Sequence, residues 1–233
     1  MQPDNVVEYQ QMRHICSSGN LEVIRWSEPS VDANLKIDAQ FAQCAARSGN
    51  RTVRLWWGSG PTIVLGCGDK PELALNLDEC RKRGIEWVRR ITGGGTVLQT
   101  PGVFNYSYTA PSGGRMDMDR VFRQGADLII KVLARFGVNA WQRGVSDVAV
   151  GELKVSGNAQ ARKWKSILLH GTLLVDIDRK LMEDVLKYPS KEPDYRDGRS
   201  HSDFIVTLKE LGAFSDPVIL EKAFASAAVE VFG

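Results

Sequence analysis

Apolar residues recur along the chain in short runs that are separated by turn residues. In the first half such runs occupy residues 21–26, 52–57, 62–66, 85–88, 96–98 and 103–109. In the second half they occupy residues 138–141, 145–150, 153–155 and 167–175. Runs of this length, bounded by Gly, Pro, Asn or Ser, are typical of β-strands. The pattern therefore predicts a chain rich in strands.

Longer stretches carry apolar residues at helical spacing. The stretch 31–47 places Leu35, Phe41 and Ala45 on one face, with Ile37 nearby. A long helix is predicted over 120–136, and Asp117 or Asp119 can cap it. Further helices are predicted over 71–83, 179–187 and 217–232. Because strands and helices do not alternate strictly, we predict an α+β fold with a mixed, largely antiparallel sheet flanked by helices.

Composition and charge narrow the classes of function. The chain has 233 residues, 43% of them hydrophobic and 25% charged, so it can bury a sizeable core. A net charge of +2 argues against a nucleic-acid binder that relies on bulk charge. No apolar run is long enough to span a membrane, and the first eight residues do not form a signal region. The four cysteines show no metal-like spacing and are typical of the reducing cytoplasm.

The stretch from Arg89 to Val97 is the first candidate for chemistry. Two adjacent arginines end an apolar run and are followed, after Ile91 and Thr92, by three consecutive glycines. Consecutive glycines are costly in conformational entropy and suit a backbone that must lie flat against a ligand. Arginine offers a planar fork of donors to phosphate or carboxylate. The stretch predicts a backbone cradle for an anion, and the alternative is a glycine-rich hairpin with two solvated arginines.

A second candidate is the segment 144–160, which is predicted to form a hairpin with Gly151 and Glu152 at the turn. Lys154 then lies near the start of a strand, beside small residues that leave open space. A lysine in such a recess suits an acyl carboxylate or an α-phosphate. The alternative is an ordinary solvent-facing lysine. A third feature is His170, a lone histidine in the apolar run 167–175, for which a core position is the alternative to a ligand role.

Taken in order, these segments resemble the lipoate-protein ligase family of the biotin/lipoate protein ligase superfamily. The resemblance covers roughly residues 30–212 and implies a single catalytic domain over 1–233. The matching residues are Arg89-Arg90-x-x-Gly93-Gly94-Gly95-x-Val97, Gly144-x-x-Asp147, Lys154-Val155-Ser156-Gly157-x-Ala159 and His170-Gly171-Thr172-Leu173-Leu174.

The resemblance implies an enzyme that works in two half-reactions. Lipoate, or octanoate, and ATP with Mg²⁺ would form an acyl-adenylate, and a lysine of a lipoyl-carrier protein (a lipoyl domain or an H-protein-like acceptor) would then form the amide. Lys154 would be the catalytic residue that bridges the acyl carbonyl and the α-phosphate. Asp147 would organise the adenylate through magnesium, and His170 and Gly171 would bind the lipoyl group. The nucleotide would be held by Arg90, Gly93, Gly94, Gly95, Thr96, Val97 and Leu98.

Departures from related enzymes leave alternatives open. Related octanoyl and lipoyl transferases carry the acyl group on a cysteine, but all four cysteines here precede residue 81. We interpret Cys67 as structural, because free cysteines are usually buried. The GRGR-type loop of biotin ligases is absent. The chain ends near Phe232, so the accessory domain of many ligases is expected as a separate subunit or not at all.

Three functions remain in competition. The first is the ATP-dependent ligase, the second is an acyltransferase that needs no ATP, and the third is a non-catalytic adenylate-binding module. The charged loop 188–202 is expected either to close over the adenylate or acceptor through Arg196, Arg199 and His201, or to be a solvated surface loop.

Overall fold

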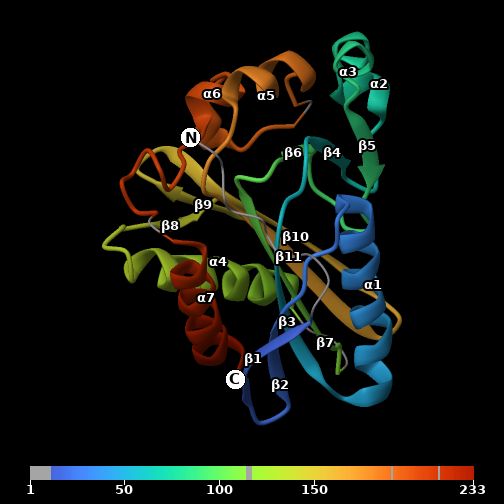
Figure 1. The fold of residues 1–233 in the computed structure, drawn as a ribbon, viewed down its shortest axis with the longest axis vertical. Coiled ribbons are helices and arrows are strands. Elements are labelled where there is room, and N and C mark those ends of the chain that lie inside the picture. Colours follow the sequence, from blue (N-terminus) through green and yellow to red (C-terminus); the bar gives the residue numbers. More distant parts are fainter. Residues whose placement is uncertain (1–11, 114–116, 190, 215) are drawn as a thin grey trace.

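A computed structural model describes residues 12–113, 117–189, 191–214 and 216–233. Its main element is an eight-stranded sheet (Figure 1). Only the β2–β3 pair is parallel, and the other paired strands of this sheet are antiparallel. The strands, in spatial order, are β1 (Arg13–Ser18), β2 (Leu21–Arg25), β3 (Arg51–Trp57), β7 (Val103–Pro111), β11 (Ser166–Leu174), β10 (Leu153–Lys163), β9 (Asp147–Val150) and β8 (Trp141–Arg143).

A second, three-stranded sheet lies at one end of the molecule. Its order is β5 (Glu86–Arg89), β4 (Thr62–Leu65) and β6 (Val97–Gln99). The β4–β5 pair is parallel and the β4–β6 pair is antiparallel. The predicted glycine turn connects β5 to β6, and therefore lies at the end of this small sheet.

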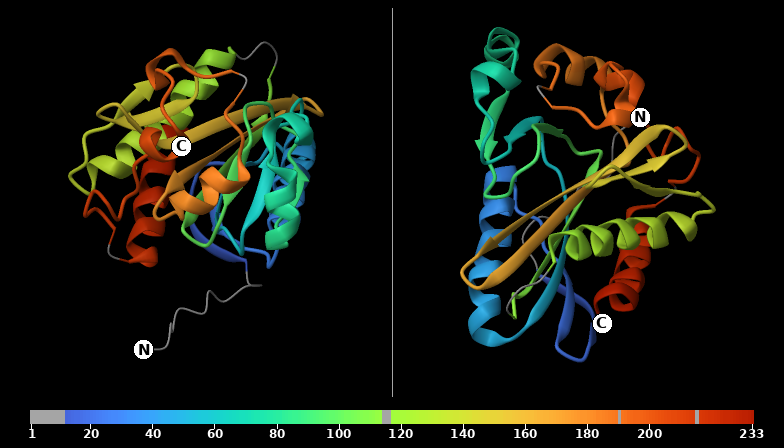
Figure 2. Two further views of the ribbon diagram at one scale, coloured as in Figure 1. Left: turned by 90° about the horizontal axis from the view of Figure 1, so that it is seen from above. Right: turned by 180° about the vertical axis from the view of Figure 1, so that it is seen from behind.

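Helices cover the large sheet on both faces. On one face, α4 (Met118–Ala134) and α7 (Pro217–Phe232) pack against each other, α4 on β10 and β11 and α7 on β1 and β2. On the other face, α1 (Val31–Ser48) contacts β3, β7, β11 and β5 (Figure 2). Shorter helices gather around the small sheet: α2 (Pro71–Ala74), α3 (Leu77–Arg83), α5 (Arg179–Val185), the 3₁₀ turn Asp194–Arg196 and α6 (His201–Phe204).

Strand alternation and helical spacing build two main cores. The larger core fills the space between the sheet and α4 and α7, with Tyr106, Phe104 and Phe224 fully buried. The smaller core joins the small sheet to α3, α5 and α6 through residues such as Ile63 and Phe204. The α4 helix is strongly amphipathic, and its N-terminus is capped by the Asp117 carboxylate, as predicted.

The structure confirms the predicted fold class and corrects several elements. The helix predicted over 71–83 is two helices, because Leu75 is extended and pairs with Leu186. The strand β1 was not predicted, because it is largely polar and partly exposed. The strand predicted over 153–155 extends to Lys163 as β10, and the one predicted over 138–141 is β8 at residues 141–143.

The buried face of α1 also differs from the predicted one. Of Leu35, Phe41 and Ala45, only Ala45 is buried. The helix instead buries Val31, Asn34, Asp38, Ala42 and Ala45, so two polar side chains point at the sheet. No helix in the described ranges is long and apolar enough to cross a membrane.

Candidate functional site

The glycine turn is held from inside by Arg90, whose side chain is only 7% exposed. Its Nη2 donates to the carbonyl oxygens of Gly93 at 2.6 Å and Gly95 at 2.8 Å. Its Nε donates to Thr92 Oγ1 at 3.0 Å, and Nη1 donates to the Val64 carbonyl at 3.3 Å. Burial lowers the pKa of Arg90 to about 10, so the guanidinium remains a cation at neutral pH. Arg90 therefore shapes the turn, and its predicted contact with phosphate stays a prediction.

The backbone N–H groups of the turn have no hydrogen-bond partner in the described part of the chain. Gly94 and Gly95 are exposed, and Gly94 takes a positive φ of 81° that favours glycine. Within the described residues, the N–H groups of Gly93, Gly94, Gly95 and Thr96 donate no hydrogen bond. Because Arg90 draws carbonyls inward, the turn presents donors to solvent, as an anion-binding nest does.

The adjoining loop packs closely under the turn. A Cβ atom on Gly66 would lie 1.9 Å from the carbonyl oxygen of Gly94, so only glycine fits there. The Cys67 N–H donates to the Thr92 carbonyl at 2.9 Å. Arg89 braces this second loop by donating to the carbonyls of Gly66, Cys67 and Asp69. Neither arginine of the pair is simply solvated, and the glycine turn is a braced structure.

The last three residues of the predicted nucleotide site follow the turn into β6. Thr96 Oγ1 donates to Asp69 Oδ2 at 2.7 Å, which places a carboxylate beside the turn. Val97 pairs with Val64 in the small sheet. The side chain of Leu98 is buried in the smaller core. We therefore expect Leu98 to contribute to the site through its backbone alone.

Lys154 lies near the start of β10, which pairs with β9 as the predicted hairpin requires. Its Nζ lies 2.8 Å from Asp147 Oδ1, and the two side chains are 28% and 10% exposed. The strand β10 bulges between Lys154 and Ser156 where it pairs with β9. A Cβ atom on Gly157 would lie 2.9 Å from both Cε and Nζ of Lys154. The glycine thus leaves the space that the lysine occupies, which confirms the predicted recess.

The charged loop 188–202 contributes a residue to this end of the site. The Tyr195 hydroxyl donates to Asp147 Oδ2 at 3.0 Å. Burial and the Asp147 carboxylate raise the pKa of Tyr195, so it remains a donor. The Arg143 guanidinium lies over the Tyr195 ring, 5.0 Å from its centroid. Both oxygens of Asp147 are therefore engaged, one by Lys154 and the other by Tyr195.

The arginines of the same loop are packed and not merely solvated. Arg196 is 4% exposed and its guanidinium lies over the rings of Tyr188 and Phe204. Arg199 also lies over Phe204 and donates to the Tyr195 carbonyl at 2.6 Å. The His201 ring contacts the Lys187 carbonyl at 3.1 Å. The interpretation as a solvated loop is wrong for Arg196, because its stacking on two aromatic rings buries it.

His170 and Gly171 point to opposite faces of β11, because successive residues of a strand alternate. His170 Nε2 lies 2.7 Å from Thr92 Oγ1, so it touches the base of the glycine turn. The space where a side chain at position 171 would lie is filled by Asn158 and Tyr106. A Cβ atom on Gly171 would lie 2.3 Å from the Asn158 amide oxygen and 2.7 Å from the Tyr106 ring. The structure does not bring these two residues together on one surface, and their role in lipoate binding stays a prediction.

Several residues of the site could not be identified from the sequence. Asp38 and Arg54 form a buried ion pair beneath His170, and Tyr195 contacts Asp147 from a distant loop. The sequence did contain one usable signal for the first two. Arg54 interrupts an apolar strand, and Asp38 lies on the face of α1 that repeats at 31, 34, 38, 42 and 45. A buried cation on a strand requires a partner of opposite charge.

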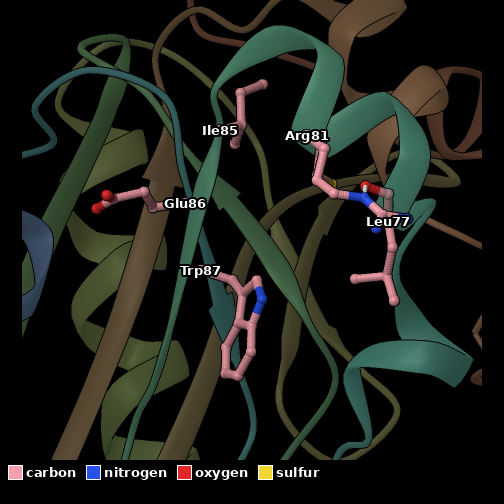
Figure 3. A pocket seen from close by; sticks show the side chains of 6 residues that line it. Leu77, Arg81, Ile85, Glu86 and Trp87 are labelled. Carbon is pink, nitrogen blue, oxygen red and sulfur yellow. Dashed lines mark hydrogen bonds between the residues drawn. The ribbon is translucent and has the colours of Figure 1, made fainter.

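A depression of about 410 Å³ lies outside both regions, between α3 and β5 (Figure 3). Trp87, which is 44% exposed, lines one side of it, and Arg81 on the other side is paired with Asp78. None of the predicted site residues belongs to it, so we do not place the chemistry there. The full lining is Leu77, Cys80, Arg81, Ile85, Glu86 and Trp87.

A comparison with protein families agrees with this geometry. The model of the lipoyl protein ligase A/B catalytic domain matches residues 30–232. The chain belongs to this family. The matched residues include both the glycine turn and the Lys154 hairpin.

Individual ligases are similar to the chain over part of their length. Lipoate-protein ligase 1 of Staphylococcus aureus is 27% identical over 168 residues, which are 72% of this chain and 50% of that protein. Lipoate-protein ligase A subunit 1 of Thermoplasma acidophilum is 27% identical over 172 residues, 68% of this chain and 65% of that protein. The chain spans about half the length of several curated relatives. In three of them the matched residues make up between 49% and 58% of the relative's length.

Solved structures of ligases share the fold. A lipoate-protein ligase A bound with ATP superposes with a TM-score of 0.77 at 23% identity, covering 92% of this chain and 85% of that one. A bipartite lipoate protein ligase of Thermoplasma acidophilum gives a TM-score of 0.74 at 22% identity, covering 91% and 83%. At these identities the likeness establishes the architecture of the catalytic domain.

Proposed function

We propose that the chain is the catalytic part of an ATP-dependent lipoate-protein ligase. The observation that carries the proposal is the glycine turn, whose N–H groups from Gly93 to Thr96 are without partners while Arg90 holds its carbonyls inward. Such a turn suits the phosphates of a nucleotide. Membership of the ligase family and likeness to a ligase bound with ATP support the same function.

In the first half-reaction, a carboxylate oxygen of lipoate attacks the α-phosphorus of ATP. The new P–O bond forms as the bond to pyrophosphate breaks, which leaves lipoyl-adenylate. The glycine turn holds the phosphates, and Lys154 lies between the carboxylate and the α-phosphate, where it stabilises the negative charge that develops. The protein supplies no nucleophile in this scheme, and its contribution is position and charge.

In the second half-reaction, the amine of an acceptor lysine attacks the acyl carbonyl. A C–N bond forms, AMP leaves with the electron pair of the C–O bond, and the amine loses a proton. Lys154 again faces the carbonyl oxygen and the leaving phosphate. Its Nζ contacts Asp147 at 2.8 Å and has two further N–H donors to offer to these oxygens. We propose His170 as a wall of the acyl site, because it lies beneath the turn.

Asp147 is the residue that would hold magnesium in this proposal. Both oxygens of Asp147 are engaged, and the described residues contain no group of three His, Cys, Asp or Glu side chains that could hold a metal. A single carboxylate that shares Mg²⁺ with nucleotide phosphates is a usual arrangement. Asp147 would hold the metal through a lone pair that the contacts with Lys154 and Tyr195 leave free. We therefore derive no step that depends on the metal.

The proposed partner is a lipoyl-carrier domain, with a lysine as the acyl acceptor. The Thermoplasma relative is described as a bipartite ligase together with its E2 lipoyl domain, which supports both a carrier acceptor and a separate accessory subunit. Octanoate is proposed as a second acyl substrate, because the chemistry at the carboxylate is the same. A reducing cytoplasm is the proposed compartment, in line with four free cysteines.

A transferase is the second candidate, and one observation favours it. Cys67 is exposed beside the glycine turn, so the burial expected of a structural cysteine is not found, and its structural role stays a prediction. An exposed thiol at this position is able to carry an acyl thioester. The third candidate, a binding module without turnover, is disfavoured by the intact lysine recess.

The test is a mass measurement of a purified lipoyl-carrier domain after incubation with the chain and lipoate. We expect a gain of one lipoyl group that requires Mg-ATP, disappears in Lys154→Ala and persists in Cys67→Ala. A gain from an acylated carrier without ATP, lost in Cys67→Ala, would establish the transferase instead. Binding of preformed lipoyl-adenylate, with no adenylate formed from lipoate and ATP and no transfer to the carrier, would establish the binding module.

A further inference from the structure

A buried polar row crosses the large sheet directly beneath the glycine turn. Arg54 on β3 pairs with Ser107 on β7, which pairs with His170 on β11. Asp38 reaches this row from α1, and its Oδ1 accepts from Arg54 at 2.8 Å and from Ser107 at 2.6 Å. The reaction described above uses neither Asp38 nor Arg54.

The carboxylate of Asp38 remains charged in this position. Burial alone would raise its pKa, but the Arg54 guanidinium, with His170 and Ser107, holds the pKa below its usual value. Asp38 Oδ2 is buried and has no hydrogen-bond partner in the described part of the chain. It lies 3.9 Å from His170 Nδ1. A buried carboxylate oxygen at this distance favours a proton on Nδ1.

The hydrogen bonds on the other side of the ring point to the same tautomer. Arg90 Nε donates its hydrogen to Thr92 Oγ1 at 3.0 Å. The Thr92 hydroxyl has one hydrogen of its own, and His170 Nε2, at 2.7 Å, is the acceptor that the described residues offer it. A Thr92 hydroxyl that donates to Nε2 leaves the imidazole proton on Nδ1, on the side of Asp38.

We propose that Thr92, His170 and Asp38 form a relay that positions the glycine turn for the nucleotide. The relay runs from the charged pair Asp38–Arg54, through His170 with its proton on Nδ1, to the Thr92 hydroxyl, which also accepts a hydrogen bond from Arg90. It fixes Arg90, and through Arg90 it fixes the carbonyls of Gly93 and Gly95. Thr92 is thus a positioning residue.

The order of groups resembles the triad of a hydrolase, but the surroundings differ. Thr92 is fully buried and its oxygen already accepts from Arg90. A nucleophile must reach a substrate, and this hydroxyl is shielded from one. The relay therefore orients the turn and takes no part in covalent chemistry.

The consequence for activity rests on the proposed function, whereas the tautomer does not. The chain has three histidines, so ¹⁵N spectra of the imidazoles can be assigned with His14→Gln and His201→Gln variants. We expect His170 to carry its proton on Nδ1 and none on Nε2, and Thr92→Val to weaken that preference. A protonated Nε2 or an imidazolium in the wild-type protein would overturn the relay, whatever the reaction proves to be.

Enzyme kinetics then show whether Thr92 positions the glycine turn for ATP or only stabilises the fold. Loss of the hydroxyl in Thr92→Val should raise the KM for ATP about tenfold, with a smaller change in the KM for lipoate. Thr92→Ser should restore the KM for ATP to about twofold of the wild-type value, because the hydroxyl returns. Thr109→Val is the matched control, since Thr109 is buried and its hydroxyl has no partner among the described residues. An unchanged KM for ATP in Thr92→Val, with only reduced stability, would contradict the proposal.

Discussion

The two ends of the site are built in different ways. The glycine turn is braced from below by the buried Arg90, which contacts Thr92, Gly93 and Gly95. At the Lys154 end, Lys154 is partly exposed and Asp147 is buried, and they are held by one ion pair and one tyrosine from a loop. Buried networks are rigid, whereas exposed pairs are weak and exchange easily.

The difference indicates which end changes during a reaction. The turn offers its N–H groups before any ligand arrives, so phosphate binding requires little rearrangement. Lys154 is held by a single ion pair, and Asp147 is held by that ion pair and one hydrogen bond from a loop tyrosine. We therefore expect ligands to reorganise the Lys154 end and to leave the shape of the turn unchanged.

The largest effect on stability is expected from Asp38→Asn, which removes the buried ion pair with Arg54 beneath the glycine turn. The substitution leaves Arg54 as an uncompensated charge that is only 1% exposed. We expect a loss of about 3–5 kcal/mol in the free energy of unfolding, measured by urea denaturation at pH 7. The double variant Asp38→Leu/Arg54→Met should lose much less, because both charges are removed.

The same carboxylate gives the sign of a pH effect. Its folded-state pKa lies below its usual value, so its stabilising contribution is present above the pKa of the unfolded state. The contribution disappears as the pH falls through the lower, folded-state value. Wild-type protein should therefore lose more stability than Asp38→Asn on acidification, and equal losses would contradict this assignment.

Lys154→Ala should have the next largest effect, on activity alone. Removal of one preorganised cation should slow lipoyl transfer about 10²–10³-fold. Because the ion pair with Asp147 is partly exposed, unfolding should change by less than about 1 kcal/mol. A variant that unfolds like Asp38→Asn would show that the two ends do not differ as described.

One glycine substitution at each end of the site tests whether the two ends differ in rigidity. Gly66→Ala places a Cβ atom 1.9 Å from the Gly94 carbonyl oxygen, and this backbone must shift. We expect a loss of about 1–3 kcal/mol in stability together with weaker binding of ATP, measured by calorimetry. Gly157→Ala meets only the flexible end of Lys154, so it should lower activity while stability stays within about 1 kcal/mol. Similar stability losses in both variants would contradict the distinction.

Tyr195→Phe should have the smallest effect. It removes one hydrogen bond to Asp147 at a partly buried position, worth about 0.5–1.5 kcal/mol. We expect activity to change by less than about tenfold, with Tyr188→Phe as the control, because Tyr188 contacts Glu192 and not Asp147. Complete loss of activity in Tyr195→Phe would assign this tyrosine to the chemistry.

The sequence predicted the elements that local pattern determines. The long helix with its Asp117 cap, the hairpin turn at Gly151 and the recess beside Lys154 all follow from neighbouring residues. The glycine run with its two arginines was predicted as a cradle. That Arg90 would turn inward to the backbone was not, because the pattern does not show which side of the turn is buried.

Contacts between distant segments could not be predicted. Asp38 meets Arg54 and His170 through the packing of a helix on a sheet, and Tyr195 meets Asp147 across 48 residues. No local signal encodes those distances. The helix over 71–83 was wrong for a related reason, because Leu75 forms a bridge with Leu186, more than a hundred residues away.

The most direct test of the account is the response of the turn's amide signals to nucleotide. In ¹⁵N-labelled protein, an ATP analogue that cannot be cleaved between its α- and β-phosphates is titrated without lipoate, and Gly93, Gly94 and Gly95 are observed. The account predicts that these three amides shift and become protected from solvent exchange, in Lys154→Ala as in the wild type. A nucleotide that binds while these amides remain unshifted and in free exchange would contradict the claim that the glycine turn holds the phosphates.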